Sequence, residues 1–417
     1  MKYLICFFVL SVFGGAVFFW QRQKKHISSA FLKAFLLGKY HGKTNSFFSL
    51  FADEIIEMAA YAISNAPYRV RKQIFASLKQ GDEKPFFAYL QAKEPPIFAL
   101  LDSFLSDKPY KSPKNSAHAS DFSKLADLLA FESQFEYNFK KKPPKNGYFL
   151  SGSKNLHQLK KLFDARRLFL KTDLKKASQT LIKLTRFYQK ENNMLKTAYV
   201  YFMLGQIYRL AKAFDTAYIM FDKALFIYTQ KKHIFGKHLV LTALGFNSLS
   251  QSNFDEAQAY FKEAYRFFGK TKDLSFQAKI LTGRSCCFLA ANNFGKAHTA
   301  ADKAYLIHKK NADKAAMAYT LELKAAAQSG TFKHQKAAFY ANTALKHYRQ
   351  TNNLIGQLKM YYMLATIYYD AGQIENAKKS YKAFTRHKNK HNLAFTEEKA
   401  PLKEMLLSKK TRKVTDF

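Results

Sequence analysis

Small and apolar residues recur with a period of 40 residues between about residues 155 and 390. One position of the period is alanine six times, at Ala177, Ala217, Ala257, Ala297, Ala337 and Ala377. The position twelve residues earlier is small throughout: Ala165, Gly205, Gly245, Ser285, Ala325 and Ala365. Small residues at fixed places let two helices approach closely, and large apolar neighbours fill the space beside them. The pattern predicts helical hairpins that stack into a solenoid, because one hairpin cannot bury its own apolar face.

Prolines separate this array from the rest of the chain. Eight of the nine lie between Pro67 and Pro144 and the ninth is Pro401, so none interrupts helices over residues 145–400. We expect an N-terminal segment over 1–26, a helical region with Pro-rich loops over 27–139, a linker over 140–155 and a basic capping segment over 391–417. The six hairpins are expected at residues 156–190, 195–230, 235–270, 275–310, 315–350 and 355–389. In the N-terminal region, helices are expected around Phe47–Ser64, over Tyr68–Lys79, after Pro85, after Pro96 and over Lys124–Asn138.

The residues of the repeat also follow a family spacing. One copy has Tyr201-x2-Leu204-Gly205-x2-Tyr208 and then Ala217-x3-Phe221; the last has Tyr361-x2-Leu364-Ala365-x2-Tyr368 and then Ala377-x3-Tyr381. This spacing resembles the tetratricopeptide repeat (TPR). The resemblance implies an all-α, right-handed superhelical solenoid of about six helical hairpins.

Three features depart from the family pattern. Arg284 and Lys324 stand where leucine is usual, the closing proline is absent, and the period is 40 residues rather than about 34. The longer period is similar to the TPR subgroup of kinesin light chains and bacterial peptide-sensing regulators. HEAT and armadillo repeats share the period, but they do not predict the small-residue spacing.

The resemblance also implies a function, because TPR solenoids bind protein segments or peptides in a groove lined by the first helix of each hairpin. The family's groove positions fall on Tyr199, Phe202, Gln206, Arg209, Thr242, Phe246, Leu249, Lys279, Thr282, Tyr319, Lys359, Tyr362, Thr366 and Tyr369. The alternative is that the apolar ones only pack between neighbouring repeats. Some TPRs hold a C-terminal carboxylate with a Lys and Asn clamp. Phe202 with Gln206, and Thr242 with Phe246, occupy those positions here, which argues against a receptor for chaperone tails.

Residues 3–20 are uncharged and apolar, and this run of 18 residues is at the short end of what a membrane-spanning helix needs. Arg22, Lys24 and Lys25 follow it, so the positive-inside rule predicts a single-pass inner-membrane anchor with the bulk of the chain in the cytoplasm. The alternative is a signal peptide cleaved after Ala16, which would make the protein periplasmic or secreted. Residues 27–40 fit either a core helix or an interfacial helix on the membrane.

The chain carries 68 Lys and Arg against 30 Asp and Glu, a net charge of +38. This excess favours anionic partners: an acidic protein or peptide, anionic lipid, or nucleic acid. We count 47 basic and 18 acidic residues over 151–417, a net of +29. A nucleic-acid-binding regulator is an alternative on charge alone, but no helix-turn-helix or RNA-binding signature supports it.

Motifs for catalysis or cofactor binding are not found in the sequence. It contains no Gly-rich phosphate loop, no HExxH and no GxSxG. His387 and His391 lie among basic residues, and Cys286 and Cys287 have no evident base beside them, so we expect no metal site and no catalytic thiol. The sequence predicts a non-enzymatic scaffold without cofactors, tethered to the membrane and binding a protein partner. An enzyme within residues 27–150 is a further alternative with no motif behind it.

Overall fold

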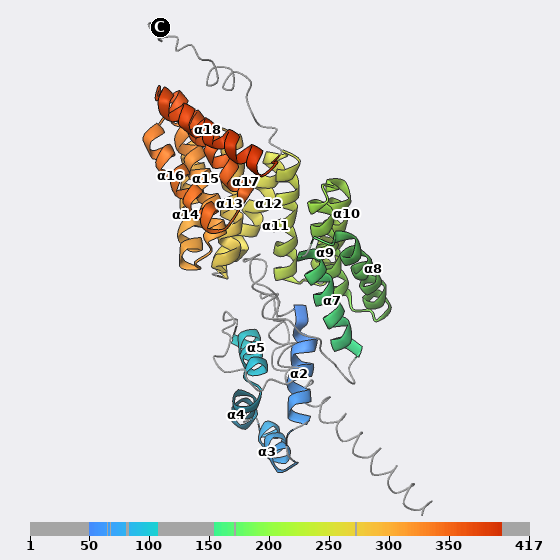
Figure 1. The fold of residues 1–417 in the computed structure, drawn as a ribbon. Coiled ribbons are helices and arrows are strands. Elements are labelled where there is room, and N and C mark those ends of the chain that lie inside the picture. Colours follow the sequence, from blue (N-terminus) through green and yellow to red (C-terminus); the bar gives the residue numbers. More distant parts are fainter. Residues whose placement is uncertain are drawn as a thin grey trace, which may run out of the picture. The chain divides into compact units, whose positions relative to one another are not determined.

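A computed structural model describes residues 50–106, except 65, 67, 81 and 82, and residues 154–393, except 171 and 272. Every element of these residues is a helix (Figure 1), which confirms the predicted all-α class. The chain divides into two compact units, residues 1–240 and 241–417. Of the expected features, the anchor at 3–20, the helices at 27–40 and 124–138, the linker up to residue 153 and the capping segment from residue 394 lie outside the described residues.

The first unit begins with four helices that pack against one another: α2 (Ala52–Ser64), α3 (Tyr68–Lys79), α4 (Lys84–Lys93) and α5 (Pro95–Ser106). The repeats begin with α7 (Lys154–Leu170), α8 (Leu174–Lys190), α9 (Met194–Leu210) and α10 (Phe214–Gln230). The boundary between the units falls within α11 (Ile234–Ser250).

The second unit continues the array with α12 (Phe254–Lys270), α13 (Leu274–Ala290), α14 (Phe294–Lys310), α15 (Lys314–Gly330), α16 (His334–Gln350), α17 (Leu354–Asp370) and α18 (Ile374–Lys390). Odd-numbered helices from α7 to α17 are the first helix of each hairpin, and even-numbered ones are the second. None of the described helices is both long and apolar enough to cross a membrane.

The 40-residue period comes from a turn that repeats every 20 residues. Helices α7 to α18 have 17 residues each, and three residues lead to the next helix. The middle residue of the turn has a left-handed backbone: Thr172, Asn192, Lys212, Lys232, Ser252, Asn292, Ala312, Phe332, Asn352, Gly372 and Asn392. This conformation lets the next N–H reach back to the helix end, as Asn193 N–H does to the Tyr188 carbonyl at 2.8 Å. Two such 20-residue segments, each a helix and its turn, make one hairpin.

The third residue of many turns caps the helix that follows. The side chains of Asp173, Asn193, Asp273, Asn293, Asp313 and Asn353 each accept a backbone N–H from the first turn of the next helix. His233 stands at the same position before α11, and its Nδ1 accepts from Gly236 N–H at 3.0 Å. The capping side chain therefore marks many, but not all, of the helix starts in the sequence: Ala213, Lys333 and Gln373 stand at the same position without a side-chain cap.

The small residues of the repeat sit where a large ring crosses from the neighbouring helix. In the first unit, a methyl group at Gly205 would lie 2.5 Å from the Phe221 ring of α10. In the second unit, Phe261 of α12 lies against two glycines, Gly245 of α11 and Gly283 of α13. The six recurring alanines are fully buried. The close helix approach that the sequence indicates is therefore present.

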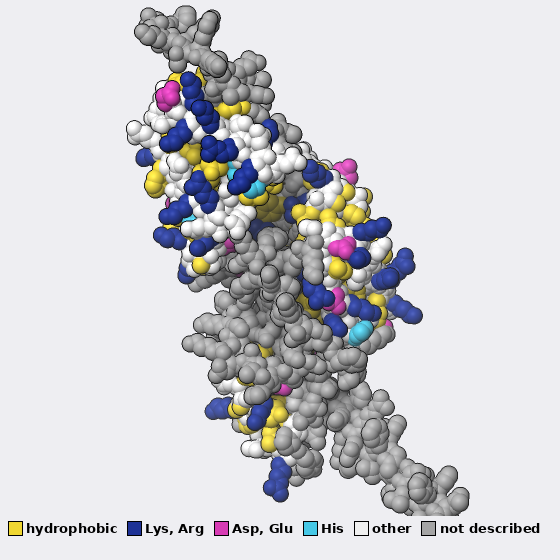
Figure 2. All heavy atoms as spheres, viewed as in Figure 1, with side chains coloured by type: hydrophobic (Ala, Val, Ile, Leu, Met, Phe, Trp, Pro, Cys, Tyr) yellow, Lys and Arg dark blue, Asp and Glu magenta, His cyan; other side chains and the backbone are white. Residues whose placement is uncertain are grey.

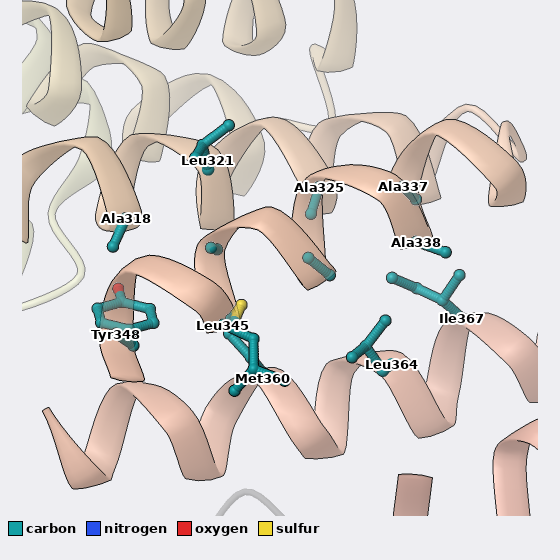
Figure 3. Packing of buried hydrophobic residues seen from close by; sticks show 12 residues of the cluster. Ala318, Leu321, Ala325, Ala337, Ala338, Leu345, Tyr348, Met360, Leu364 and Ile367 are labelled. Atoms are coloured by element: carbon teal, nitrogen blue, oxygen red, sulfur yellow. The ribbon is translucent and has the colours of Figure 1, made fainter. Parts of the chain in front are cut away.

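In the copy that has Ala341 at the position of Phe221 and Phe261, smaller side chains fill the hairpin. Figure 3 shows the core between α15, α16 and α17, in which Ala325, Ala337, Leu345, Leu364 and Ile367 belong to one buried cluster and Ala338 points toward Ile367. Tyr348 closes one end of this cluster, and its hydroxyl donates to Glu322 at 2.7 Å. Helix spacing is thus set by the pairing of small and large residues in each copy.

The two basic residues at leucine positions are accommodated by aromatic rings. Arg284 lies over the rings of Tyr265 and Phe288, at 5.6 and 5.5 Å. Lys324 is 7% exposed, pairs with Asp302 of α14, and has its Nζ 4.5 Å from the Tyr340 ring centroid. Such cation–π contacts offset part of the cost of burying a charge.

Replacing Lys324 with leucine is expected to leave the stability of the second unit unchanged or to raise it by up to about 2 kcal/mol, because a leucine packs without the cost of desolvating an ammonium. Asp302 is 44% exposed, so it stays solvated after the change. Urea unfolding followed by circular dichroism measures the difference. Lys324→Ala is the comparison and is expected to destabilise; a Leu variant weaker than the Ala variant would contradict this account of the site.

Candidate partner-binding groove

In the first unit, two of the predicted groove residues are not on an open surface. Tyr199 and Phe202, one turn apart on α9, are 2% and 1% exposed. The Phe51 ring, which immediately precedes α2, stands edge-on to Tyr199 at a centroid distance of 5.2 Å and an angle of 82°. Tyr199 stacks on Phe202 at 6.0 Å, and Phe202 contacts Phe221 at 6.1 Å. A row of aromatic rings therefore runs from the hairpin core to residue 51.

The other two predicted residues of α9 bind each other. A guanidinium nitrogen of Arg209 donates to Gln206 Oε1 at 3.1 Å. Gln206 is buried and Arg209 is half-buried. These two side chains thus form a local polar pair at the C-terminal half of α9.

Lys196, which lies one turn before Tyr199, was not among the predicted groove residues. Its Nζ donates to Glu54 Oε2 and to the Leu50 carbonyl, both at 2.6 Å, and lies 4.4 Å from the Phe51 ring centroid. The other copies carry uncharged residues here: Leu156, Gly236, Phe276, Ala316 and Gly356. A single charge in an otherwise uncharged register was the available signal.

In the second unit, the predicted residues of α11 and α13 begin the candidate groove. Thr242 is buried, whereas Phe246 and Leu249 are half-buried. Phe246 packs edge-on against Phe261 at 4.9 Å, and Lys279 of α13 places its Nζ 5.9 Å from the Phe246 ring centroid. Thr282 uses its hydroxyl to donate to the Ala278 carbonyl at 2.8 Å. Phe246 therefore belongs partly to the core and partly to the surface.

Tyr319 of α15 is 41% exposed and is the most open of the predicted aromatic residues in this unit. Its hydroxyl lies 3.4 Å from Cys286 Sγ. Burial raises the pKa of both the Cys286 thiol and the Tyr319 phenol. Both groups are therefore neutral at physiological pH and offer hydrogen bonds rather than charge.

The last predicted residues lie on α17. Lys359, Tyr362, Thr366 and Tyr369 are all half-buried. Tyr362 contacts the Phe384 ring at 5.3 Å, and the Thr366 hydroxyl donates to the Tyr362 carbonyl at 3.2 Å. Tyr362 and Tyr369 pack at the edge of a cluster formed by Leu358, Ala365, Ala377, Tyr381 and Phe384.

Two hollows lie away from all of the predicted residues. One of about 640 Å³ is formed by α8, α9 and α10 in the first unit and includes Met194, Tyr201 and the exposed Phe226. Another of about 300 Å³, between α16 and α17 in the second unit, includes His334, Phe339 and Tyr368. The repeat pattern gives no sign of either hollow, because their side chains differ from copy to copy.

The described residues hold no group of three or more His, Cys, Asp or Glu side chains that could bind a metal. The ring centroids of His387 and His391 lie 4.7 Å apart, and His387 Nε2 is 3.1 Å from the Leu354 carbonyl oxygen. Burial raises the pKa of the Cys287 thiol to about 12, which disfavours a thiolate nucleophile. On the face seen in Figure 2, Lys and Arg side chains outnumber acidic ones over both units.

The family comparison identifies one repeat directly. Residues 358–389, which comprise most of α17 and α18, match the family model described as the tetratricopeptide repeat. No curated protein matches the sequence.

Solved structures extend the likeness to most of the chain. A STAND protein (signal transduction ATPase with numerous domains) with a TPR sensor, from Pyrococcus horikoshii, superposes with a TM-score of 0.51 at 12% identity, over 86% of this chain and 49% of that one. This chain therefore spans about half the length of that relative.

Two further structures superpose with lower scores. Aspartyl phosphate phosphatase F from Bacillus subtilis gives 0.44 at 17% identity over 68% and 75% of the chains. BtubC from P. vanneervenii gives 0.45 at 13% identity over 58% and 95%. By the matched repeat and the shared fold, the chain carries a tetratricopeptide repeat at residues 358–389 within an all-helical array of the kind found in TPR proteins.

Proposed function

We propose that the protein is a non-enzymatic scaffold that binds an acidic segment of a partner protein along α13, α15 and α17. The observation that carries the proposal is the register of Lys279, Tyr319 and Lys359, which occupy the same position in three successive copies. Two ammonium groups on either side of an exposed tyrosine suit a segment that presents carboxylates and an apolar side chain. The excess of basic residues, 68 against 30, favours the same partner by attracting it over longer distances.

The proposal includes a membrane tether at residues 3–20, with the repeats on the cytoplasmic side. Its support is the uncharged run itself and the basic residues Arg22, Lys24 and Lys25 directly after it. A tethered scaffold would hold its partner at the membrane surface. The rest of the chain would need no catalytic group for this role.

Affinity capture from solubilised membranes tests the groove. A discrete partner protein is expected with the full-length protein and with a form lacking residues 1–26, and its recovery is expected to fall about tenfold with Lys279→Glu plus Lys359→Glu. The matched control is Lys303→Glu plus Lys336→Glu, which makes the same change of charge at exposed lysines on the second helices α14 and α16. Phe202 and Phe246 are unsuitable for this test, because both pack in the hairpin cores.

Three outcomes would contradict parts of the proposal. Equal loss with the control pair would show that net charge, not the groove, holds the partner. Recovery of only nucleic acid or lipid that salt removes would have the same meaning. A mature N-terminus at Val17 would replace the tether with a cleaved signal peptide.

A further inference from the structure

A buried ion pair joins two segments of the first unit that are 142 residues apart in the chain. The Lys196 and Glu54 side chains are each 3% exposed, and their charged atoms lie 2.6 Å apart. Removing both groups from water is costly, and the cost is recovered only where the remaining hydrogen bonds are also satisfied. The Leu50 carbonyl supplies one of these by accepting a second N–H from Lys196. The site is therefore complete only when a segment with a carboxylate lies on α9.

The same segment also brings a ring to the aromatic row of α9. Phe51 lies edge-on to Tyr199 and, at the same time, under the ammonium of Lys196. Edge-to-face rings and a cation over a ring both favour this arrangement beyond simple burial. Without Phe51, Tyr199 would be the outermost ring of the row and would lose its edge-on contact.

The spacing on the two sides matches. Lys196 and Tyr199 are three residues apart on α9, and their partners Glu54 and Phe51 are three residues apart on the segment. Residues three apart lie on the same face of a helix. Two contacts in this register make a specific recognition pattern: an aromatic residue followed three positions later by a carboxylate.

Of these two α9 residues, Tyr199 stands at a position where the TPR resemblance places a ligand, whereas Lys196 does not. We propose that α9 is a recognition site for a helical segment with an aromatic residue and an acidic residue three positions later, and that residues 50–54 fill this site within the chain. A partner protein that carries the same pattern then competes with residues 50–54 for Lys196 and Tyr199. The choice of an acidic partner follows from Lys196 and from the chain's excess of positive charge. Competition by a partner rests on the proposed function, whereas filling of the site by residues 50–54 does not.

Binding of a labelled peptide of residues 47–66 tests the site directly. We expect fluorescence anisotropy to show weak binding to the full-length protein, and binding about tenfold tighter to the full-length Phe51→Ala, Glu54→Ala variant, in which the internal segment no longer competes. Adding Lys196→Glu to that variant is expected to reverse the gain. Adding Lys183→Glu instead, at an exposed position of α8, is the charge-matched control and should leave the gain intact.

A second measurement holds even where the double alanine variant fails to fold. A Glu54→Lys peptide is expected to bind the full-length Lys196→Glu protein more tightly than the native peptide does, and the order is expected to reverse for the native protein. Equal binding of both peptides to both proteins would overturn the site. Dimerisation of the native protein that Lys196→Glu abolishes would assign the site to a second copy and overturn filling within the chain. Failure of the α13–α17 capture experiment would leave these results unaffected.

Discussion

Replacing Phe261 with alanine is expected to lower the free energy of unfolding of the second unit by about 3–5 kcal/mol. The ring is fully buried, and it fills the space between α11, α12 and α13. A methyl group at Gly245 would lie 2.7 Å from the ring and one at Gly283 would lie 2.5 Å from it, on the other helix. The ring cannot move away from one glycine without approaching the other. Its loss leaves a cavity that three helices would have to close together.

The same contact predicts a coupling that urea unfolding can measure. Gly283→Ala alone is expected to cost about 1–3 kcal/mol, because its methyl group meets a ring with no free volume behind it. In the Phe261→Ala background the clash is gone, and the same substitution is expected to be neutral or stabilising. Gly295→Ala in α14 is the control: its methyl group meets nothing within 4 Å, so we expect a gain of up to about 1 kcal/mol. Additive effects of the Gly283 and Phe261 changes would contradict the packing account.

Lowering the pH from 7.5 to 5 is expected to remove about 2 kcal/mol of stability from the first unit through His233. Burial lowers the pKa of His233 from 6.5 to about 4, and Lys196 lowers it further, against an opposing backbone hydrogen bond. The unfolded chain therefore takes up a proton between pH 6.5 and 4 that the folded chain does not. The stabilisation is complete above pH 6.5 and is lost as the pH falls toward 4.

Protonation also removes a helix cap, because Nδ1 of neutral His233 accepts the Gly236 N–H. His233→Asn keeps a capping acceptor that does not titrate, as Asn193 and Asn353 do at the same position of other copies. Unfolding curves at pH 7.5 and 5 are expected to differ by about 2 kcal/mol less for this variant than for the native protein. The comparison concerns only the pH-dependent difference, so a fixed cost of losing the ring does not affect it. Identical losses in both proteins would assign the acid sensitivity to other groups.

The helices of the repeat array could be predicted from the sequence because their signals are local. A three-residue turn that recurs every 20 residues, with a capping residue such as Asn193 or Asp313, ends one helix and starts the next. The packing of the Phe261 ring against Gly245 depends only on residues within one hairpin. Such contacts repeat at fixed separations, so the period alone indicates which faces meet.

The accessible part of the groove could not be predicted in the same way. The register places Tyr199 and Tyr319 at equivalent positions, yet Tyr199 is 2% exposed and Tyr319 is 41% exposed. Phe51, which belongs to a segment outside the repeats, packs edge-on against Tyr199. A repeat pattern describes contacts between copies, and it carries no information on a segment that packs on only one of them.

The sequence by itself determined the all-α class, the hairpin length and the close packing at the small positions, because each depends on residues near one another along the chain. The tertiary structure decided which face of α9 is covered. It also decided why a lysine stands at position 196, where the other copies carry uncharged residues. The pairing of Lys196 with Glu54 spans 142 residues, and neither side chain signals the other through spacing or periodicity. Such a contact exists only once both segments are folded, since a buried charge is tolerated only where its partner has already been brought to it.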